Sequence, residues 1–270
     1  MSLEKTEAIV LKAFNWSESS RTVVFFSRDF GKLALVDKGG RSMKSRRGRL
    51  QTFARLELSF YDSKKESRGY VREIDALQSF SMEGDGALGR LAYGSAACEL
   101  MYLLLPEDEP QRQLYDYFAS YLGYVAAVPK TCLPSLFVAF FLRVLSQLGY
   151  HPSLAYCAGC GRPATSDESN GGFANGAGNV PFFADRGGVL CPSCQAPTDY
   201  YIPLSGVGYR HLAKLQNASL KEAAGMPIRY AEAAQLLEAL TRFAACQTDL
   251  KTDLKSLEFL QKLKNSTLIE

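Results

Sequence analysis

The chain has 270 residues, of which 47% are hydrophobic and 22% charged, and its formal net charge is +3. This composition is that of an ordinary globular protein of two or three domains, and it excludes fibrous and disordered classes. The first residues contain no apolar stretch that could serve as a signal peptide, and the longest uncharged apolar run, residues 131–142, is too short to span a bilayer. We therefore expect no membrane partner and a cytoplasmic location, where thiols stay reduced.

Basic residues are concentrated near the N-terminus. Residues 1–80 hold 16 Lys and Arg against 10 Asp and Glu, whereas residues 81–270 hold 15 against 18. Six of these cations fall in one short window, namely Lys38, Arg41, Lys44, Arg46, Arg47 and Arg49. The window indicates a polyanionic partner such as a nucleic acid. The alternative is a solvated basic loop without a partner.

Five short runs in the first 80 residues have the pattern of β-strands. They are residues 7–12, 22–27, 32–37, 54–61 and 69–75. The fourth run alternates apolar and polar side chains with period two, and Gly31 suits a hairpin loop between the second and third. Five short strands suit a small barrel, and the five-stranded OB-fold is the nucleic-acid-binding version. The basic window lies between the third and fourth strands, so we expect a loop on the barrel rim.

Sites for single-stranded nucleic acid combine a positive groove with aromatic platforms on which bases stack. The candidate platforms are Phe14, Trp16, Phe53 and Tyr61, each of which could instead be a barrel core residue. Further cations that could extend the positive surface are Arg21, Arg28, Lys32, Arg55 and Arg72. Of these we count Lys32 among the candidate DNA contacts. A single charge on a strand is, however, usually only solvated.

After residue 80 the apolar pattern becomes helical. A periodic run from residue 88 ends at Pro106, and a second helix is expected after Pro110. Residues 136–145 are apolar nearly all round, which predicts a central buried helix. Its one charge, Arg143, could snorkel or pair, or could mark a peptide-docking groove. Helical periodicity returns after Ser205, a good N-cap, and continues toward the C-terminus.

Four cysteines form two close pairs, Cys157 with Cys160 and Cys191 with Cys194. Four thiolates at this spacing can enclose one tetrahedral zinc ion and leave no position for substrate, so we predict one structural Zn²⁺. The rival interpretation is a Cys-X-X-Cys thiol oxidoreductase, but two matched pairs outside a βαβ context argue against it. Residues 166–179, between the pairs, read as an exposed loop. We expect Cys98, Cys132 and Cys246 to be core residues.

These patterns predict an α+β multidomain chain. Residues 1–80 form the OB-fold DNA-binding domain, residues 81–150 and 204–270 form two parts of a helical domain, and residues 151–203 form a zinc-ribbon-like insert between them. The sequence contains no phosphate-binding loop. His151 and His211 have no neighbouring Ser, Cys or carboxylate cluster that would make a triad, so we expect no enzyme.

Several short segments, taken in order, resemble the bacterial RecO family of recombination mediators over almost the whole chain. The segments are residues 7–12 (EAIVLK), 30–32 (FGK), 38–39 (KG), 44–46 (KSR), 50–53 (LQTF), 99–100 (EL), 148–150 (LGY), 157–161 (CAGCG) and 255–256 (KS). The resemblance implies an N-terminal OB-fold, a helical domain with a cysteine zinc element and no enzymatic turnover. The Gly- and Asn-rich insert 166–179 departs from the compact family pattern.

The resemblance also implies a function in DNA repair and recombination at the nucleoid. Such a protein binds single- and double-stranded DNA and anneals complementary strands. With its partner RecR it helps load the recombinase RecA onto DNA coated by single-strand-binding protein, whose acidic, Phe-ended C-terminal tail it recognises. Carried onto this sequence, the basic window supplies phosphate contacts and the four cysteines bind the metal.

We place the tail pocket near Arg143, because an acidic tail needs a cation beside an apolar pocket. A zinc-ribbon interaction scaffold, with a basic loop that serves only solubility, is the competing class.

Overall fold

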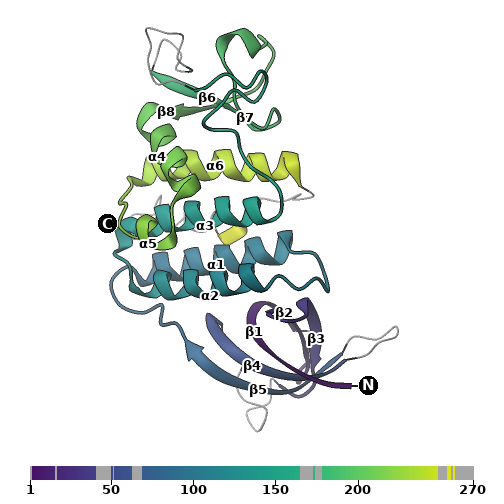
Figure 1. The fold of residues 1–270 in the computed structure, drawn as a ribbon. Helices are drawn as coiled ribbons and strands as arrows, with labels where there is room; N and C mark the ends of the chain where they lie inside the picture. Colours follow the sequence, from purple (N-terminus) through teal and green to yellow (C-terminus); the bar gives the residue numbers. More distant parts are fainter. Residues whose placement is uncertain are drawn as a thin grey trace. The chain divides into compact units, whose positions relative to one another are not determined.

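The structure is a computed structural model that describes residues 2–15, 17–40, 50, 52–62, 69–164, 173, 178–248, 254–256 and 258. These residues form two compact units, one reaching to Ala127 and the other spanning Val128–Glu258. The first unit holds a β-barrel and two helices, and the second holds the cysteine pairs and further helices (Figure 1). The predicted class, a five-stranded barrel followed by a helical region with a four-cysteine cluster, is confirmed.

The barrel is built from β1 (Ser2–Asn15), β2 (Arg21–Ser27), β3 (Gly31–Asp37), β4 (Ala54–Asp62) and β5 (Tyr70–Ser79). β1 pairs with β2 and β4, β2 pairs with β3, and β4 pairs with β5, all antiparallel. A parallel contact between Val36 and Tyr70 closes the ring (Figure 1). The inward side chains, among them Phe25, Leu56 and Phe60, form one apolar core.

A β-bulge bends β1 and reverses its alternation. The pairing with β2 shifts register between Val10 and Lys12, so Leu11 is the extra residue. Ala8 and Val10 lie in the barrel core. Strict alternation would therefore send Lys12 and Phe14 inward as well. The bulge instead turns both to the outer surface, where they are exposed.

Two helices cover part of the outer surface of the barrel, α1 (Ala87–Leu104) and α2 (Arg112–Ala127). Phe26 of β2 lies outside the barrel core and packs edge-on against Tyr115 of α2, with the ring centroids 5.5 Å apart. Burial of these aromatic rings supplies apolar stabilisation at this junction. The helices thus belong to the barrel unit.

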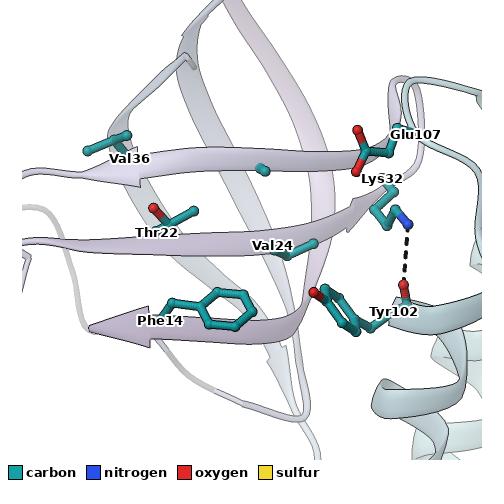
Figure 2. A pocket seen from close by; sticks show the side chains of 8 residues that line it. Phe14, Thr22, Val24, Lys32, Val36, Tyr102 and Glu107 are labelled. Atoms are coloured by element: carbon teal, nitrogen blue, oxygen red, sulfur yellow. Dashed lines mark hydrogen bonds between the residues drawn. The ribbon is translucent and has the colours of Figure 1, made fainter. Parts of the chain in front are cut away.

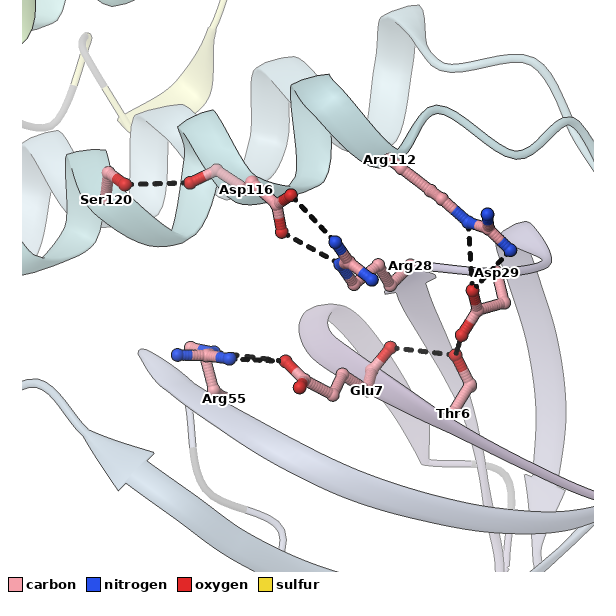
Figure 3. A network of polar contacts seen from close by, with 8 residues as sticks. All are labelled: Thr6, Glu7, Arg28, Asp29, Arg55, Arg112, Asp116 and Ser120. Atoms are coloured by element: carbon pink, nitrogen blue, oxygen red, sulfur yellow. Dashed lines mark hydrogen bonds and ion pairs between the residues drawn. The ribbon is translucent and has the colours of Figure 1, made fainter.

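Ion pairs also fasten α2 to the barrel (Figure 3). Arg28 donates to both carboxylate oxygens of Asp116 at 2.9 and 3.0 Å. Arg112 pairs with Asp29 at 3.0 Å, and Asp29 in turn accepts a hydrogen bond from Thr6 at 2.9 Å. These pairs are partly exposed, so each contributes modestly to the stability of the fold. The bidentate geometry of an Arg–carboxylate pair nevertheless fixes the orientation of the helix.

The second unit combines helices with a small sheet. Its elements are η1 (Lys130–Cys132), α3 (Leu133–Gln147), β6 (Asn179–Phe183), β7 (Gly188–Val189), η3 (Pro192–Cys194), β8 (Ile202–Ser205), α4 (Gly206–Asn217), α5 (Leu220–Ala223) and α6 (Tyr230–Gln247). The sheet order is β7-β6-β8, and α3 contacts α4, α5 and α6. α3 is buried along most of its length, as predicted. Ser205 caps α4, with its Oγ accepting from the Gly208 amide at 3.0 Å.

Among the described helices, none combines the length and apolar character needed to cross a membrane.

Two glycines with positive φ, Gly31 at the start of β3 and Gly39 just after it, lead to the first prediction. Gly31 and Gly39 both have φ near +70°, at 71° and 72°, so Ala at either position is strained by the backbone. A Cβ at Gly31 would also collide with the backbone of Glu109, whereas nothing lies near a Cβ at Gly39. We expect Gly31→Ala to lower the unfolding free energy by about 1–3 kcal/mol more than Gly39→Ala, measured by denaturant unfolding. Equal losses would contradict the close contact at Glu109.

Candidate metal centre and nucleic-acid interface

The structure brings the four predicted cysteines together. The Sγ atoms of Cys157, Cys160, Cys191 and Cys194 all lie within 4.8 Å of one another. Cys157 and Cys191 are buried, Cys194 is half-buried and Cys160 is exposed. The cluster therefore sits at the edge of its unit, with one side toward solvent.

Each pair is held in a tight turn. In the first, the Gly161 amide donates to the Cys157 carbonyl at 2.9 Å, and Gly161 has a φ of 73°, which glycine adopts without strain. In the second, the Cys194 amide donates to the Cys191 carbonyl at 2.9 Å. A Cβ at Gly159 would crowd the Cys194 side chain, so a small residue is required beside the cluster. The Cys-X-X-Cys spacing and these glycines explain why the sequence folds this way.

The thiols influence one another strongly. Burial raises the pKa of Cys157, but backbone hydrogen bonds, led by the Cys191 amide, outweigh it and lower that pKa to about 6. The Cys191 amide lies 3.3 Å from the Cys157 Sγ. Interactions with the thiols of Cys191 and Cys160 raise the pKa of Cys194 to about 12. Four thiols this close cannot all ionise unless a cation shares their charge.

The geometry fits a tetrahedral metal ion. Four sulfurs at about 2.3 Å from a zinc ion would lie about 3.8 Å from one another. The Cys160 and Cys191 sulfurs are 3.7 Å apart. Amide donors to the sulfur are the usual outer partners of such a site. These residues could hold one metal ion, with no position left for substrate.

The basic window connects β3 to β4. Its first residue, Lys38, is described, and its Nζ lies 4.0 Å from the centroid of the Tyr70 ring, a cation–π contact. The predicted DNA contacts Arg41, Lys44, Arg46, Arg47 and Arg49 lie outside the described residues. The order of strands nonetheless places the window where the sequence predicts it, between the third and fourth strands of the barrel.

The start of this segment is anchored by a buried ion pair. Arg21 of β2 donates to Asp37 of β3 at 2.9 Å, and the Asp37 side chain is only 2% exposed. A Cβ on Gly40 would overlap the Asp37 carboxylate, so glycine is required at this position. A buried charge of this kind persists only with its partner, which makes Arg21 structural.

Two other arginines that the sequence offered as positive surface also have carboxylate partners, whereas Arg72 is exposed on β5. Arg28 pairs with Asp116, and Arg55 donates to Glu7 at 2.6 Å. Hydrogen bonding to Asp116 raises the pKa of Arg28, and hydrogen bonding to Glu7 raises that of Arg55. The expectation that Arg28 and Arg55 extend a free cationic surface is therefore wrong: both charges are balanced locally.

The structure shows the surroundings of Lys32 and of three candidate stacking residues. The Lys32 Nζ donates to the Tyr102 carbonyl at 3.2 Å, and burial lowers the pKa of this half-buried lysine. Phe14 is 40% exposed and Tyr61 is 38% exposed, so neither is a barrel core residue. Phe53 packs on α1, where its ring lies against Gly94. Trp16 lies outside the described residues.

In the second unit, Arg143 lies on α3 and is half-buried. The structure also reveals a pairing that the sequence did not predict: His211 Nε2 lies 2.9 Å from Ser135 Oγ. Ser135 is fully buried, so this hydrogen bond joins α3 to α4 and offers no accessible nucleophile. Of the other cysteines, Cys98 and Cys132 are buried as expected, but Cys246 is exposed, which corrects its assignment to the core.

Comparisons with known proteins agree over both parts of the chain. Residues 1–80 match the family model for the recombination protein O N terminal, and residues 86–258 match the model for the recombination protein O C terminal. A DNA repair protein RecO from Symbiobacterium thermophilum is 30% identical, and the alignment covers 98% of this chain and all of that relative. The RecO protein of Pelobacter propionicus is 31% identical, with 97% and 98% of the two chains covered.

The cysteine cluster yields the second prediction. Cys160→Ser removes one ligand, and Cys246→Ser removes an equally exposed thiol outside the cluster. We expect one divalent metal ion per wild-type chain by elemental analysis, and loss of that ion in Cys160→Ser alone. At a free metal concentration a hundredfold above Kd, binding of the ion raises the free energy of unfolding by about 2.7 kcal/mol. Cys160→Ser should then lower Tm by about 5–10 °C.

Cys246→Ser should keep both the metal and the Tm. A wild-type chain that carries two disulfides and no metal would contradict this prediction and favour the redox interpretation.

Proposed function

The chain belongs to the recombination protein O (RecO) family of DNA repair proteins, and from that membership we propose that it binds single- and double-stranded DNA and anneals complementary strands. The observation that carries the proposal is the placement of six cations in one segment between β3 and β4 of a closed five-stranded barrel. Barrels of this type are a recurrent scaffold for nucleic-acid binding.

The proposed mechanism is electrostatic. Two complementary strands repel each other through their phosphates, and they can approach only when cations neutralise part of that charge. Arginines and lysines in a loop contact phosphates without reading base edges, so binding tolerates any sequence and leaves bases free to pair. This function needs no covalent step, and we propose that the protein is not an enzyme.

The local charge balance supports this division of labour. On the barrel, the strand residues Arg21 and Arg55 and the turn residue Arg28 each have a carboxylate partner. The strands therefore add little net field of their own. The cations of the basic window are left as the concentrated positive charge of the unit, because residues 38–49 contain no Asp or Glu.

Family membership also leads us to propose two protein partners. Together with RecR, the protein would help load RecA onto DNA coated by single-strand-binding protein at the nucleoid. It would recognise the acidic, Phe-ended C-terminal tail of that coating protein. Arg143 on α3 is the proposed cation for this tail, because it is the one charge on an otherwise apolar helix. We propose Zn²⁺ as the ion of the cysteine cluster, since four thiolates in tetrahedral array are typical of structural zinc.

The third prediction concerns salt. If about five phosphates on a single strand are neutralised, log K against log salt should fall with a slope of roughly −3.5. The triple change Arg46→Glu, Arg47→Glu and Arg49→Glu should weaken binding to all sequences about equally and reduce the steepness of the slope by roughly 2. The charge-matched control reverses Arg162, Lys221 and Arg229, three exposed cations of the second unit, and should change binding far less. Fluorescence anisotropy with mixed-sequence oligonucleotides measures both.

Unchanged binding in the first triple variant would point to another face of the protein. A wild-type chain without any salt-dependent DNA binding would favour the alternative, a scaffold that contacts only proteins.

The fourth prediction concerns the tail. A peptide with the acidic, Phe-ended sequence should bind the wild-type chain. Arg143→Ala should weaken that binding by roughly ten- to a hundredfold, since a charge-assisted hydrogen bond contributes about 1.5–3 kcal/mol. Arg210→Ala on α4 is the matched control and should bind normally. The functional readout is annealing of DNA coated by single-strand-binding protein, with and without RecR. Equal peptide binding by both variants would remove Arg143 from the tail site.

A further inference from the structure

The outer surface of the barrel unit contains a cavity that the basic window does not account for (Figure 2). Its volume is about 630 Å³, and its apolar wall is formed by Val24, Ala34 and Val36 of β2 and β3. A cavity of this size on the face of a soluble barrel is large enough for a small planar group. It lies within the first unit, because all its lining residues come from β1, β2, β3, α1 and the segment after α1.

Two aromatic rings form a corner of this cavity. Phe14 of β1 and Tyr102 of α1 have ring centroids 6.2 Å apart and an interplanar angle of 55°. A planar group that enters can stack on one ring and meet the other edge-on, which are the two favoured aromatic geometries. The Lys12 ammonium lies over both rings, 5.0 Å from the centroid of Phe14 and 4.5 Å from that of Tyr102, so this flexible side chain moves aside when a base stacks on these faces.

The other end of the cavity is polar. Lys32 gives one of its three ammonium protons to the Tyr102 carbonyl, which leaves two for another acceptor. The exposed Glu107 carboxylate lines the same end and interacts electrostatically with Lys32. Figure 2 shows both side chains at one end of the cavity, with the Phe14 ring at the other. The site therefore offers a donor and an acceptor side by side beyond a stacking surface.

We propose that this cavity holds one unstacked nucleobase of a single DNA strand, stacked on Phe14 and Tyr102, with its polar edge toward Lys32 and Glu107 and its phosphate beside Lys12. The inference deepens the proposed function, because it rests on DNA binding and adds a base subsite to the phosphate contacts. Stacking is tolerant of sequence, since every base has a π-face.

The charges favour a base over an acidic peptide as the occupant. A peptide tail would bring carboxylates to a site that already carries the Glu107 carboxylate, and like charges at close range repel. A base edge carries both acceptors and N–H donors, which complement an ammonium and a carboxylate together. Lys12 does not line the cavity, and once its ammonium leaves the ring faces it can meet the single negative charge of a phosphate.

The experiment compares a base-bearing oligonucleotide with an abasic one of the same length, by anisotropy competition with the full chain. Phe14→Ala should weaken binding of the base-bearing strand by about tenfold, within the range measured for loss of one stacked base, and leave the abasic strand unchanged. Phe14→Trp should restore binding. Tyr201→Ala removes a comparably exposed aromatic of the second unit, outside the cavity, and should change neither strand.

Each other outcome has a defined meaning. If Phe14→Ala binds both strands like the wild type while the steep salt dependence remains, the base subsite is wrong and the proposed function stands. If Phe14→Ala weakens both strands equally, or Phe14→Trp fails to restore binding, stacking is not the cause and the subsite is wrong. If the wild-type chain binds neither strand at low salt, the proposed function fails and the subsite with it. If an acidic, Phe-ended peptide competes at the cavity of the wild type but not of Phe14→Ala, the occupant is a peptide.

Discussion

The barrel unit depends on one strand that serves two neighbours. β1 pairs with β4 through residues 2–8 and with β2 through residues 8–15, so Ala8 faces a partner on each side. A flat strand could not turn from one partner to the other, and the bulge at Leu11 supplies the bend. Two further register shifts lie between β4 and β5, and the ring closes where β3 meets β5. The extra residue in β1 also sends Lys12 and Phe14 to the outer surface, where Phe14 lines the cavity.

The second unit solves a different problem. Its sheet is small, with β7 only two residues long, and the polypeptide between Cys160 and Cys191 is 30 residues long. A short sheet beside a long excursion of the chain gains little from its own hydrogen bonds. Bringing four sulfurs together closes that excursion at both ends, and metal binding adds directly to the free energy of folding. A metal ion bound by the four cysteines would thus restrain its own unit, and four thiolate ligands would leave it no open position for a substrate.

Sequence reasoning located the elements well where one local rule decides the structure. Alternation located β4, the Cys-X-X-Cys spacing located the cluster, and Ser205 marked the start of α4. It did not reveal the bulge, because nothing in the letters distinguishes Leu11 from the strand residues around it. The alternation of residues 8, 10, 12 and 14 would equally suit a core role for Phe14, and only the register with β2 decides against it.

Long-range pairings were also beyond local rules. Arg28 and Asp116 are far apart in the sequence, as are Ser135 and His211. No local sequence pattern indicates that these residues pair. A strand arginine is therefore ambiguous until the fold is known: it can bind a phosphate or balance a carboxylate. On this barrel Arg21, Arg28 and Arg55 do the latter, so the proposed phosphate contacts are those of the segment between β3 and β4 together with Lys12.

The small number of proposed phosphate contacts has a consequence for annealing. A protein that stacked every base of a bound strand would hold the strand firmly but would block pairing. A protein that held only phosphates would leave the bases free but would let the strand slide, since backbone contacts are uniform along it. Under the proposed function, one base cavity together with about five neutralised phosphates would satisfy both needs: the captured base would fix the position of the strand, and its neighbours would stay free to pair. Two structural features lead to this proposed balance. The bulge places Phe14 outside the core, and ion pairs with carboxylates occupy Arg21, Arg28 and Arg55.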